Sequence, residues 1–247
     1  MATHNGFTVW LTGMSGAGKS TLAEYISARL RQVGRSVEIL DESEVGDDLY
    51  KGIGETKEER NLAVRRLGFV ADLLSRNQVA VLVAAVSPYK STRDENRRRM
   101  NRYLEVFVDC PTDKLIARDT TGRYKKALQG EIPNFIGITE PYEPPHSAEV
   151  TIQSDSETVE EGGLRIFQSL LDLGYVNGEE LKVITGKRMK ANPIPVKKGA
   201  RRDTKAPHAK PAKAAATPPA KGSKARPAAR AARVAKPAKK AAGKSKR

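Results

Sequence analysis

One segment constrains this chain more than any other, because residues 13–20 fit the pattern G-x-x-x-x-G-K-[ST] of phosphate-binding loops. An apolar run at 7–11 precedes it as a predicted buried strand, and residues 21–31 follow as a predicted helix. The glycines let successive backbone N–H groups point into one concavity, where the helix start adds partial positive charge. We expect this phosphate loop to bind ATP through Gly13, Ser15, Gly16, Ala17, Gly18, Lys19, Ser20 and Thr21.

Two side chains of the phosphate loop have a predicted role in chemistry. Lys19 would reach the β- and γ-phosphates, and the Ser20 hydroxyl would hold Mg²⁺. We therefore expect Lys19 to be essential for phosphoryl transfer. The alternative is a simple glycine turn before a helix, but that alternative does not explain why every position of the motif is filled.

Apolar runs alternate with helical segments along most of the chain. Strands are predicted at 7–12, 36–40, 79–86, 104–109 and 149–153. Helices are predicted at 21–31, 56–77, 92–103, 112–118 and 157–173, and capping boxes that start at Thr56 and Thr92 open the second and third of them. Loops without a clear period are predicted at 42–55 and 119–145. The alternation predicts an α/β fold in residues 1–185, with a five-stranded parallel sheet and helices on both faces.

Ligands of parallel sheets bind where the carboxyl ends of the strands meet. We expect the phosphate loop, Asp41, Ser87 and Asp109 at that edge. Asp41 would orient an acceptor hydroxyl or hold Mg²⁺ through water, unless it only caps a turn or a helix. Asp109 is the weaker candidate, because Cys110-Pro111-Thr112 follows it and a capping role fits equally well.

The stretch at 119–145, called the lid segment below, is 27 residues long. A loop of that length inside a compact domain is usually functional or disordered. Tyr124, Phe135 and several prolines would pack over a ligand, and Lys125 would meet its anionic part; a floppy insertion is the alternative. Arg118, just before the segment, would stack on a base or contact a phosphate.

The charge of the chain is divided unevenly. Residues 191–247 carry 18 Lys and Arg and one acid, a net charge of +17, which leaves −2 of the overall +15 for the rest. This stretch is rich in Lys, Ala and Pro and has no aromatic residue, so we expect a disordered basic tail from 186 to 247. Such a tail binds nucleic acid or another polyanion nonspecifically, unless it is only a solvated extension.

The cysteine count, the first residues and the lengths of the apolar runs bear on the cellular compartment. Cys110 is the single cysteine, which excludes an internal disulfide and fits a reducing compartment. The polar start at 1–6 is unlike a signal peptide, and no apolar run approaches the roughly 20 residues of a membrane span. We expect a soluble cytoplasmic protein without a membrane span. The sequence leaves open whether it forms a homodimer.

Several segments resemble the adenylylsulfate kinase family, over about residues 5–175. The phosphate loop matches closely, and Val86-Ser87-Pro88-Tyr89 resembles the family's I-S-P-Y segment. The lid segment is the most specific match, through Gly122-Arg123-Tyr124-Lys125-Lys126-Ala127, Asn134-Phe135 and Pro141-Tyr142-Glu143-Pro144-Pro145.

The resemblance implies a P-loop kinase fold and a reaction of sulfate assimilation, in which Mg-ATP phosphorylates the ribose 3′-hydroxyl of adenosine 5′-phosphosulfate. By the same carry-over, Phe135 would stack on the substrate adenine and Lys125 would contact the nucleotide when the lid closes. The expected catalytic residues are Lys19, Asp41 and Ser87. The expected substrate-binding residues are Asp41, Arg60, Arg65, Val86, Ser87, Lys125 and Phe135, and Arg118 joins the ATP-binding set.

The chain departs from the family pattern on the acceptor side, where Ser43 replaces an acid, Gly46 an arginine, Glu55 a phenylalanine and Ala63 an asparagine. Each lost hydrogen bond to a charged group costs about 1.5–3 kcal/mol. Three functions therefore stay open: an adenylylsulfate kinase, a kinase of this family with another hydroxyl acceptor, or a degenerate kinase that binds a polyanion through its tail.

Overall fold

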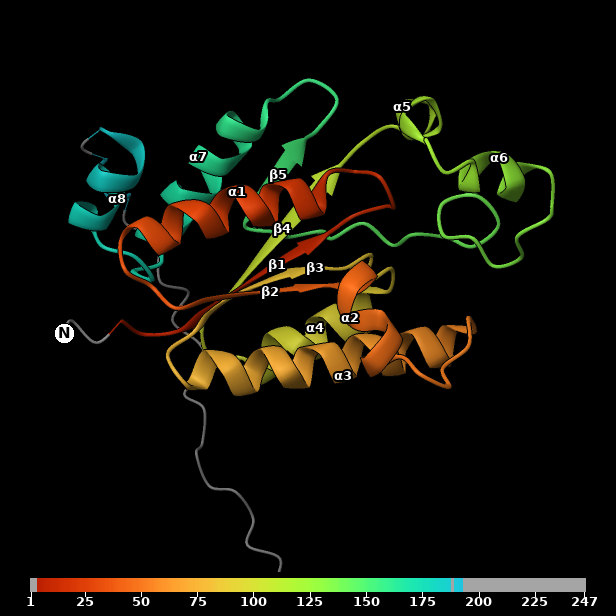
Figure 1. Cartoon of the computed structure of the whole chain (residues 1–247), viewed down its shortest axis with the longest axis horizontal. Coiled ribbons are helices and arrows are strands. Elements are labelled where there is room, and N and C mark those ends of the chain that lie inside the picture. Colours follow the sequence, from red (N-terminus) through yellow and green to blue (C-terminus); the bar gives the residue numbers. More distant parts are fainter. Residues whose placement is uncertain (1–3, 188, 193–247) are drawn as a thin grey trace, which may run out of the picture. The chain divides into compact units, whose positions relative to one another are not determined.

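The computed structural model describes residues 4–187 and 189–192, and these form a sheet of five strands between two layers of helices (Figure 1). The predicted parallel α/β sheet is confirmed. The strands are β1 (Phe7–Thr12), β2 (Val37–Asp41), β3 (Ala80–Ala84), β4 (Tyr103–Asp109) and β5 (Val150–Gln153). The helices are α1 (Lys19–Gln32), α2 (Glu42–Leu49), α3 (Lys57–Arg76), α4 (Lys90–Arg99), α5 (Thr112–Arg118), α6 (Arg123–Leu128), α7 (Val159–Asp172) and α8 (Gly178–Thr185).

The strand order is β2-β3-β1-β4-β5, with β1 in the middle and every neighbouring pair parallel. Each residue of β1 and β3 is buried, as expected for strands that helices cover on both faces. Parallel strands end at one edge of the sheet, so the loops that follow β1, β2, β3 and β4 meet there. The phosphate loop follows the central strand, so the loops after β3 and β4 flank it on its two sides.

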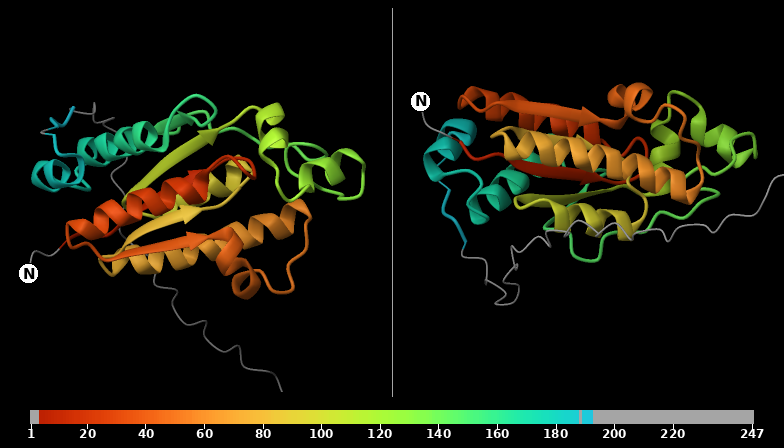
Figure 2. Two further views of the ribbon diagram at one scale, coloured as in Figure 1. Left: turned by 45° about the horizontal axis from the view of Figure 1, so that its top comes forward. Right: turned by 90° about the horizontal axis from the view of Figure 1, so that it is seen from below.

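Helices α1, α7 and α8 lie on one face of the sheet, and α3 and α4 lie on the other (Figures 1 and 2). Leu11 packs with Ile26 and Phe167 in the first core, whereas Trp10 packs with Leu67 in the second. Successive side chains of a strand point to opposite faces, so the neighbours Trp10 and Leu11 anchor different cores. The central strand thereby ties both helical layers to the phosphate loop.

The expectation of a loop at 42–55 is wrong for its first half, which forms α2. The carboxylate of Asp41 caps this helix by accepting a hydrogen bond from the backbone N–H of Ser43 over 2.9 Å. Glu42 and Glu44 stand in the first turn, where negative charge stabilises a helix start. Hydrophobic periodicity does not predict this helix, because α2 contains Gly46 and buries none of its residues.

The basic helix expected at 92–103 begins at Lys90 and ends at Arg99, because Tyr103 already belongs to β4. The capping box expected at Thr92 does not form, and the Thr92 hydroxyl instead donates to the side-chain oxygen of Asn61. The carboxylate of Glu143, far along the chain, accepts the backbone N–H of Lys90 over 2.8 Å. A tertiary contact therefore caps α4.

Besides α2, two more helices lie where none was expected. The lid segment contains α6, which follows Gly122 in the left-handed conformation at φ +71°. The other is α8, which begins with a capping box between Asn177 and Glu180. The Glu180 carboxylate also forms a buried ion pair with Arg35, at 2.6 Å, and this pair fastens α8 to the segment after α1.

The domain boundary expected after residue 185 stays a prediction. Helix α8 ends at Thr185, and a few described residues follow it. The backbone N–H of Asn192 donates to the Asp172 carboxylate over 2.7 Å. The basic tail predicted at 186–247 lies almost wholly outside the described residues, so its expected disorder stays a prediction. In the described part of the chain, every helix is too short or too polar to cross a membrane.

Candidate active site

A cavity of about 440 Å³ opens at the carboxyl edge of the sheet. Its walls come from the phosphate loop, the start of α2, the turn and helix at 50–64, the end of β3 and the lid segment. The lining residues are Ser15, Gly16, Lys19, Ser20, Asp41, Glu42, Ser43, Tyr50, Ile53, Gly54, Glu55, Arg60, Ala63, Val64, Ala84, Val86, Pro88, Arg123, Ile132, Asn134, Phe135 and Ile136. This cavity joins the phosphate loop to the lid in one space.

The phosphate loop needs its glycines. Gly13, Gly16 and Gly18 have φ values of +149°, +78° and +96°, a region that favours glycine. A Cβ atom at Gly13 would lie 2.3 Å from the carbonyl oxygen of Val108 on β4, so the loop approaches the neighbouring strand too closely for a side chain. The backbone is therefore pre-shaped as a cradle for phosphate oxygens.

The ammonium group of Lys19 is folded back onto its own loop. It donates to the carbonyl oxygens of Gly13 and Met14 over 3.0 and 2.8 Å. Burial lowers the pKa of Lys19 to about 8, although the carboxylates of Glu42 and Asp41 act in the opposite direction. These contacts leave a buried cation beside the cradle, ready to exchange loop carbonyls for phosphate oxygens.

Asp41 stands at the end of β2, beside the phosphate loop. Burial alone would raise the pKa of its carboxyl, but hydrogen bonds from Ser20 and Ser43 and the charge of Lys19 outweigh burial and hold the pKa below its ordinary value. The Ser43 hydroxyl donates to it over 2.6 Å. Asp41 therefore caps α2, as one alternative had it, and also lines the cavity as a carboxylate, while its role toward an acceptor hydroxyl or Mg²⁺ stays a prediction.

The turn after β3 forms another wall. The backbone N–H of Val86 donates to the Glu42 carboxylate over 2.7 Å, which ties this turn to α2. Ser87 has a φ of +42° and is 1% exposed, and its hydroxyl accepts a hydrogen bond from the indole of Trp10. Val86 and Pro88 line the cavity, while the side chain of Ser87 faces the core between them.

The lid segment is packed against the rest of the site. The Phe135 ring is 6% exposed, lines the cavity and meets the Tyr124 ring edge-on, with centroids 4.9 Å apart. The Tyr124 hydroxyl donates to the Ser15 carbonyl oxygen over 2.7 Å, and Arg60 donates to the Asn134 carbonyl oxygen over 2.8 Å. The lid thus contacts both the phosphate loop and α3.

Outside the phosphate loop, four predicted site residues do not line this cavity: Arg65, Arg118, Lys125 and Ser87, whose hydroxyl is turned into the core toward Trp10. The guanidinium of Arg65 pairs with Glu95 at 2.8 Å on the outer side of α3. Arg118 donates to the Ser154 carbonyl oxygen over 2.9 Å, at the start of the loop after β5. Lys125 is exposed on α6. The other predicted substrate residues, Asp41, Arg60, Val86 and Phe135, do line the cavity.

Sequence reasoning missed several residues of the cavity. Glu42 is the first residue of the unexpected helix α2, and Tyr50 follows its last residue. Arg123 places its guanidinium 5.6 Å from the centroid of the Phe135 ring. Arg123 stands beside Tyr124 in the matched lid motif, so that match could have suggested it. No sequence signal pointed to Tyr50, because α2 itself was not predicted.

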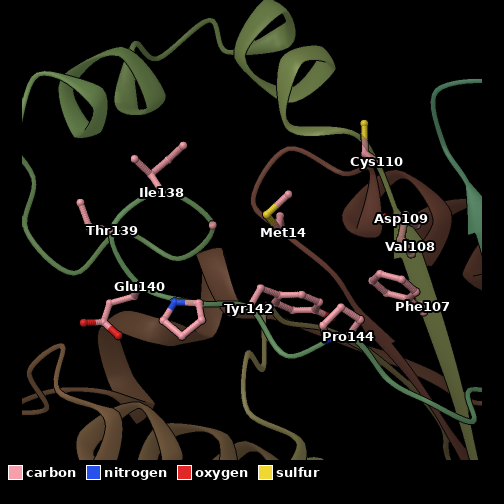
Figure 3. Close-up of a pocket in the computed structure, with 12 residues that line it drawn as sticks. Met14, Phe107, Val108, Asp109, Cys110, Ile138, Thr139, Glu140, Tyr142 and Pro144 are labelled. Atoms are coloured by element: carbon pink, nitrogen blue, oxygen red, sulfur yellow. The ribbon is translucent and has the colours of Figure 1, made fainter.

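A second cavity, of about 490 Å³, lies on the other side of the phosphate loop between Met14, the end of β4 and residues 137–144 (Figure 3). Asp109, expected at the rim, lines this second cavity rather than the first. The Phe107 and Tyr142 rings stack here, with centroids 5.9 Å apart. Asp109, the weaker of the two carboxylate candidates, therefore lies apart from the cavity that Asp41 lines.

Comparisons with known proteins agree with this geometry. Residues 5–153 match the model of the adenylylsulphate kinase family. The chain is 48% identical over 171 residues to an adenylyl-sulfate kinase of Rippkaea orientalis. The aligned residues cover 69% of this chain and 94% of that protein. The Mycobacterium tuberculosis APS kinase CysC, solved in complex with AMPPNP and APS, superposes with a TM-score of 0.64 at 33% identity, over 68% of this chain and 98% of that one.

A hexameric APS kinase from Thiobacillus denitrificans is also similar, with a TM-score of 0.54 and 31% identity over 71% of this chain and 30% of that one. The family match includes the phosphate loop and all of the lid segment. The fold is therefore that of P-loop kinases, and the protein is a kinase-type phosphotransferase. This chain belongs to the adenylylsulphate kinase family.

Proposed function

We propose that this protein uses ATP to phosphorylate the ribose 3′-hydroxyl of adenylylsulfate, giving 3′-phosphoadenylylsulfate for sulfate assimilation. One observation carries the proposal beyond family membership: a single cavity joins Lys19 and Ser20 of the phosphate loop to Phe135 of the lid. ATP at the phosphate loop and an acceptor nucleotide with its adenine at Phe135 would share that space.

The reaction asks the protein mainly to position two nucleotides and to neutralise charge. Lys19 binds the β- and γ-phosphate oxygens of ATP. The ionised carboxylate of Asp41 accepts a hydrogen bond from the acceptor hydroxyl and takes its proton as the new oxygen–phosphorus bond forms. The bond between the γ-phosphorus and the β,γ-bridging oxygen breaks, and ADP leaves with the electron pair.

Mg²⁺ fits the residues at the phosphate loop. The Ser20 hydroxyl, which hydrogen-bonds to the Asp41 carboxylate, would be the direct ligand, and Asp41 would face the ion through a bound water. Mg²⁺ prefers this type of site, in which one or two protein oxygens act with phosphates and water. The described residues contain no larger cluster of His, Cys, Asp and Glu that could hold a metal. When bound, the ion would neutralise charge on the transferred phosphoryl group.

The acceptor adenine would stack on Phe135, and Arg60 and Arg123 would face its anionic groups from two sides of the cavity. Ser87 would act by fixing the turn that carries Val86 and Pro88, through its bond to the Trp10 indole. Lys125 and Arg118 would contact nucleotides only after rearrangement, because neither lines the cavity, and Arg65 would first have to leave Glu95.

A coupled assay of ADP release, with and without adenylylsulfate, tests the proposal. We expect release that depends on adenylylsulfate, and its loss by more than a thousandfold in Lys19→Ala. Lys182→Ala, an exposed lysine on α8, is the matched control and should behave like the wild type. Full activity of Lys19→Ala, or release that ignores adenylylsulfate, would contradict the proposal.

One observation favours a second candidate, a kinase of this family with a less anionic acceptor. The Glu55 carboxylate lines the cavity and lies 3.6 Å from the Arg60 guanidinium, so it already neutralises a cation that an anionic acceptor would need. Running the same assay with uncharged nucleoside and sugar acceptors separates the two. A lower KM for an uncharged acceptor than for adenylylsulfate would favour this candidate.

We also propose that the basic tail binds nucleic acid or another polyanion nonspecifically, supported by its net charge of +17 over residues 191–247. Truncation at Asn192 should abolish retention on DNA and leave kinase kinetics unchanged. Equal retention by the truncated protein would refute the role. The lone Cys110 supports a cytoplasmic location, which fractionation tests.

Two copies are further proposed to form a homodimer. The side chains of Phe69 and Leu73 are 55% and 44% exposed on α3 and offer apolar surface for such a contact. Light scattering should give twice the mass of one chain, and Phe69→Glu should restore the mass of a monomer.

A further inference from the structure

One cavity residue has a polar group without a partner. In the described part of the chain, five buried side-chain atoms have no hydrogen-bond partner: Thr8 Oγ1, the Tyr50 hydroxyl, Asn96 Oδ1, the Tyr103 hydroxyl and Ser154 Oγ. Of these five residues, Tyr50 alone lines the active-site cavity. Buried polar groups are nearly always paired, so an unpaired one at a cavity indicates a partner that arrives with a ligand.

The position of the Tyr50 ring is fixed by α2. Tyr50 follows the last residue of this helix, and its backbone N–H donates to the Gly46 carbonyl oxygen over 2.8 Å. The ring lies against Gly46, where an added Cβ would stand 3.5 Å from the ring atom Cδ2. That distance is ordinary van der Waals contact, so the ring packs directly over position 46 at the cavity wall.

The hydroxyl of Tyr50 is available as a donor. Burial, with the charges of Glu42 and Asp41, raises its pKa above the ordinary value, so the hydroxyl keeps its proton at working pH. Both neighbouring carboxylates already accept other hydrogen bonds, Asp41 from Ser43 and Glu42 from the Val86 N–H. The Tyr50 hydroxyl donates to neither carboxylate and has no other partner in the described part of the chain, so it is left for an oxygen atom that enters the cavity.

We propose that Tyr50 is a further substrate-binding residue, whose hydroxyl donates a hydrogen bond to an oxygen of the acceptor nucleotide. The inference rests on the proposed function, because that function supplies the acceptor. The hydroxyl lies on the same wall as Asp41, which receives the reacting hydroxyl, so Tyr50 holds the acceptor near its reacting end. ATP reaches the cavity from the phosphate loop and does not use this contact.

Tyr50→Phe tests the proposal, because it removes one oxygen atom and keeps the ring. Its KM for adenylylsulfate should rise about tenfold, the size of one good hydrogen bond, while KM for ATP and the melting temperature stay unchanged. Tyr103→Phe is the matched control, since it removes an equally unpaired hydroxyl far from the cavity. All of its kinetic constants should equal those of the wild type.

Calorimetric titration of adenylylsulfate into the full chain, saturated with Mg-ADP, gives a second readout. The dissociation constant should rise about tenfold in Tyr50→Phe. An unchanged KM and dissociation constant in Tyr50→Phe, with an active wild type, would overturn the role of Tyr50 alone. A wild type that neither binds adenylylsulfate nor releases ADP with it would overturn the proposed function, and the role of Tyr50 would fall with it.

Discussion

The indole N–H of Trp10 donates a hydrogen bond to the hydroxyl of Ser87 over 3.0 Å, and both side chains are almost fully buried. Trp10 belongs to the central strand and Ser87 to the turn that borders the acceptor cavity. The bond thereby holds Ser87 at its φ of +42°, in a region that most side chains avoid.

Ser87→Ala should lower stability more than activity. The substitution leaves the Trp10 N–H buried without a partner, which costs about 1–3 kcal/mol. The removed hydroxyl faces the core, so kcat should stay within about threefold of the wild type, a factor worth less than 1 kcal/mol. Urea unfolding and the ADP-release assay measure the two effects. A thousandfold loss of kcat in a folded variant would show instead that the hydroxyl takes part in the transfer.

The binding of an ATP analogue should weaken above pH 8. Burial lowers the pKa of Lys19 to about 8 in the free protein, so Lys19 loses its proton as the pH rises through that value. Phosphate oxygens favour the charged form, so binding then requires proton uptake. The dissociation constant should rise about tenfold between pH 7 and pH 9.

The stability of the free protein should show the opposite trend. Lys19 has a folded pKa of about 8 and an unfolded value near 10.5, so the unfolded chain binds more protons between them. Its contribution to the free energy of unfolding should therefore increase with pH across that window. Lys19→Met removes the titrating group, so its free energy of unfolding should lack this increase. In the binding experiment, a dissociation constant of the wild type that does not change with pH would contradict the pKa assigned to Lys19.

Arg60→Met should loosen the lid. The Arg60 guanidinium donates to the Asn134 carbonyl oxygen, next to Phe135, and this contact joins α3 to the lid segment. Hydrogen exchange at residues 132–140 should speed up by about fivefold, consistent with loss of roughly 1 kcal/mol. Arg76→Met, at the far end of α3, is the control. Unchanged exchange in Arg60→Met would show that other contacts hold the lid.

Arg93→Met should destabilise the whole domain. Its guanidinium is 2% exposed and donates to the Glu105 carboxylate and to the carbonyl oxygens of Ser87 and Glu143. Removing it leaves the buried Glu105 carboxylate to Arg97 alone, at 2.9 Å, and a lost hydrogen bond to a charged group costs about 1.5–3 kcal/mol. Thermal unfolding measures the loss. Arg98→Met, an exposed neighbour on α4, should melt like the wild type.

The sequence was informative wherever local signals agree with tertiary structure. The phosphate loop, the five strands and the capping box at Thr56 follow from short-range patterns, and each is found. Helix α2 could not be predicted, because it buries none of its residues and is stabilised by a cap at Asp41. The burial of the Ser87 hydroxyl depends on Trp10, 77 positions away, and no local pattern encodes such a contact.

Asp41 ends β2, caps α2 and supplies a carboxylate to the cavity, so one residue connects folding with chemistry. Exchanging it for asparagine would preserve the cap and remove the charge, whereas exchanging it for glutamate would keep the charge and misfit the cap. The two variants should separate catalytic loss from local unraveling. A substitution at this position should therefore be felt twice, in the start of α2 and in the proposed phosphoryl transfer.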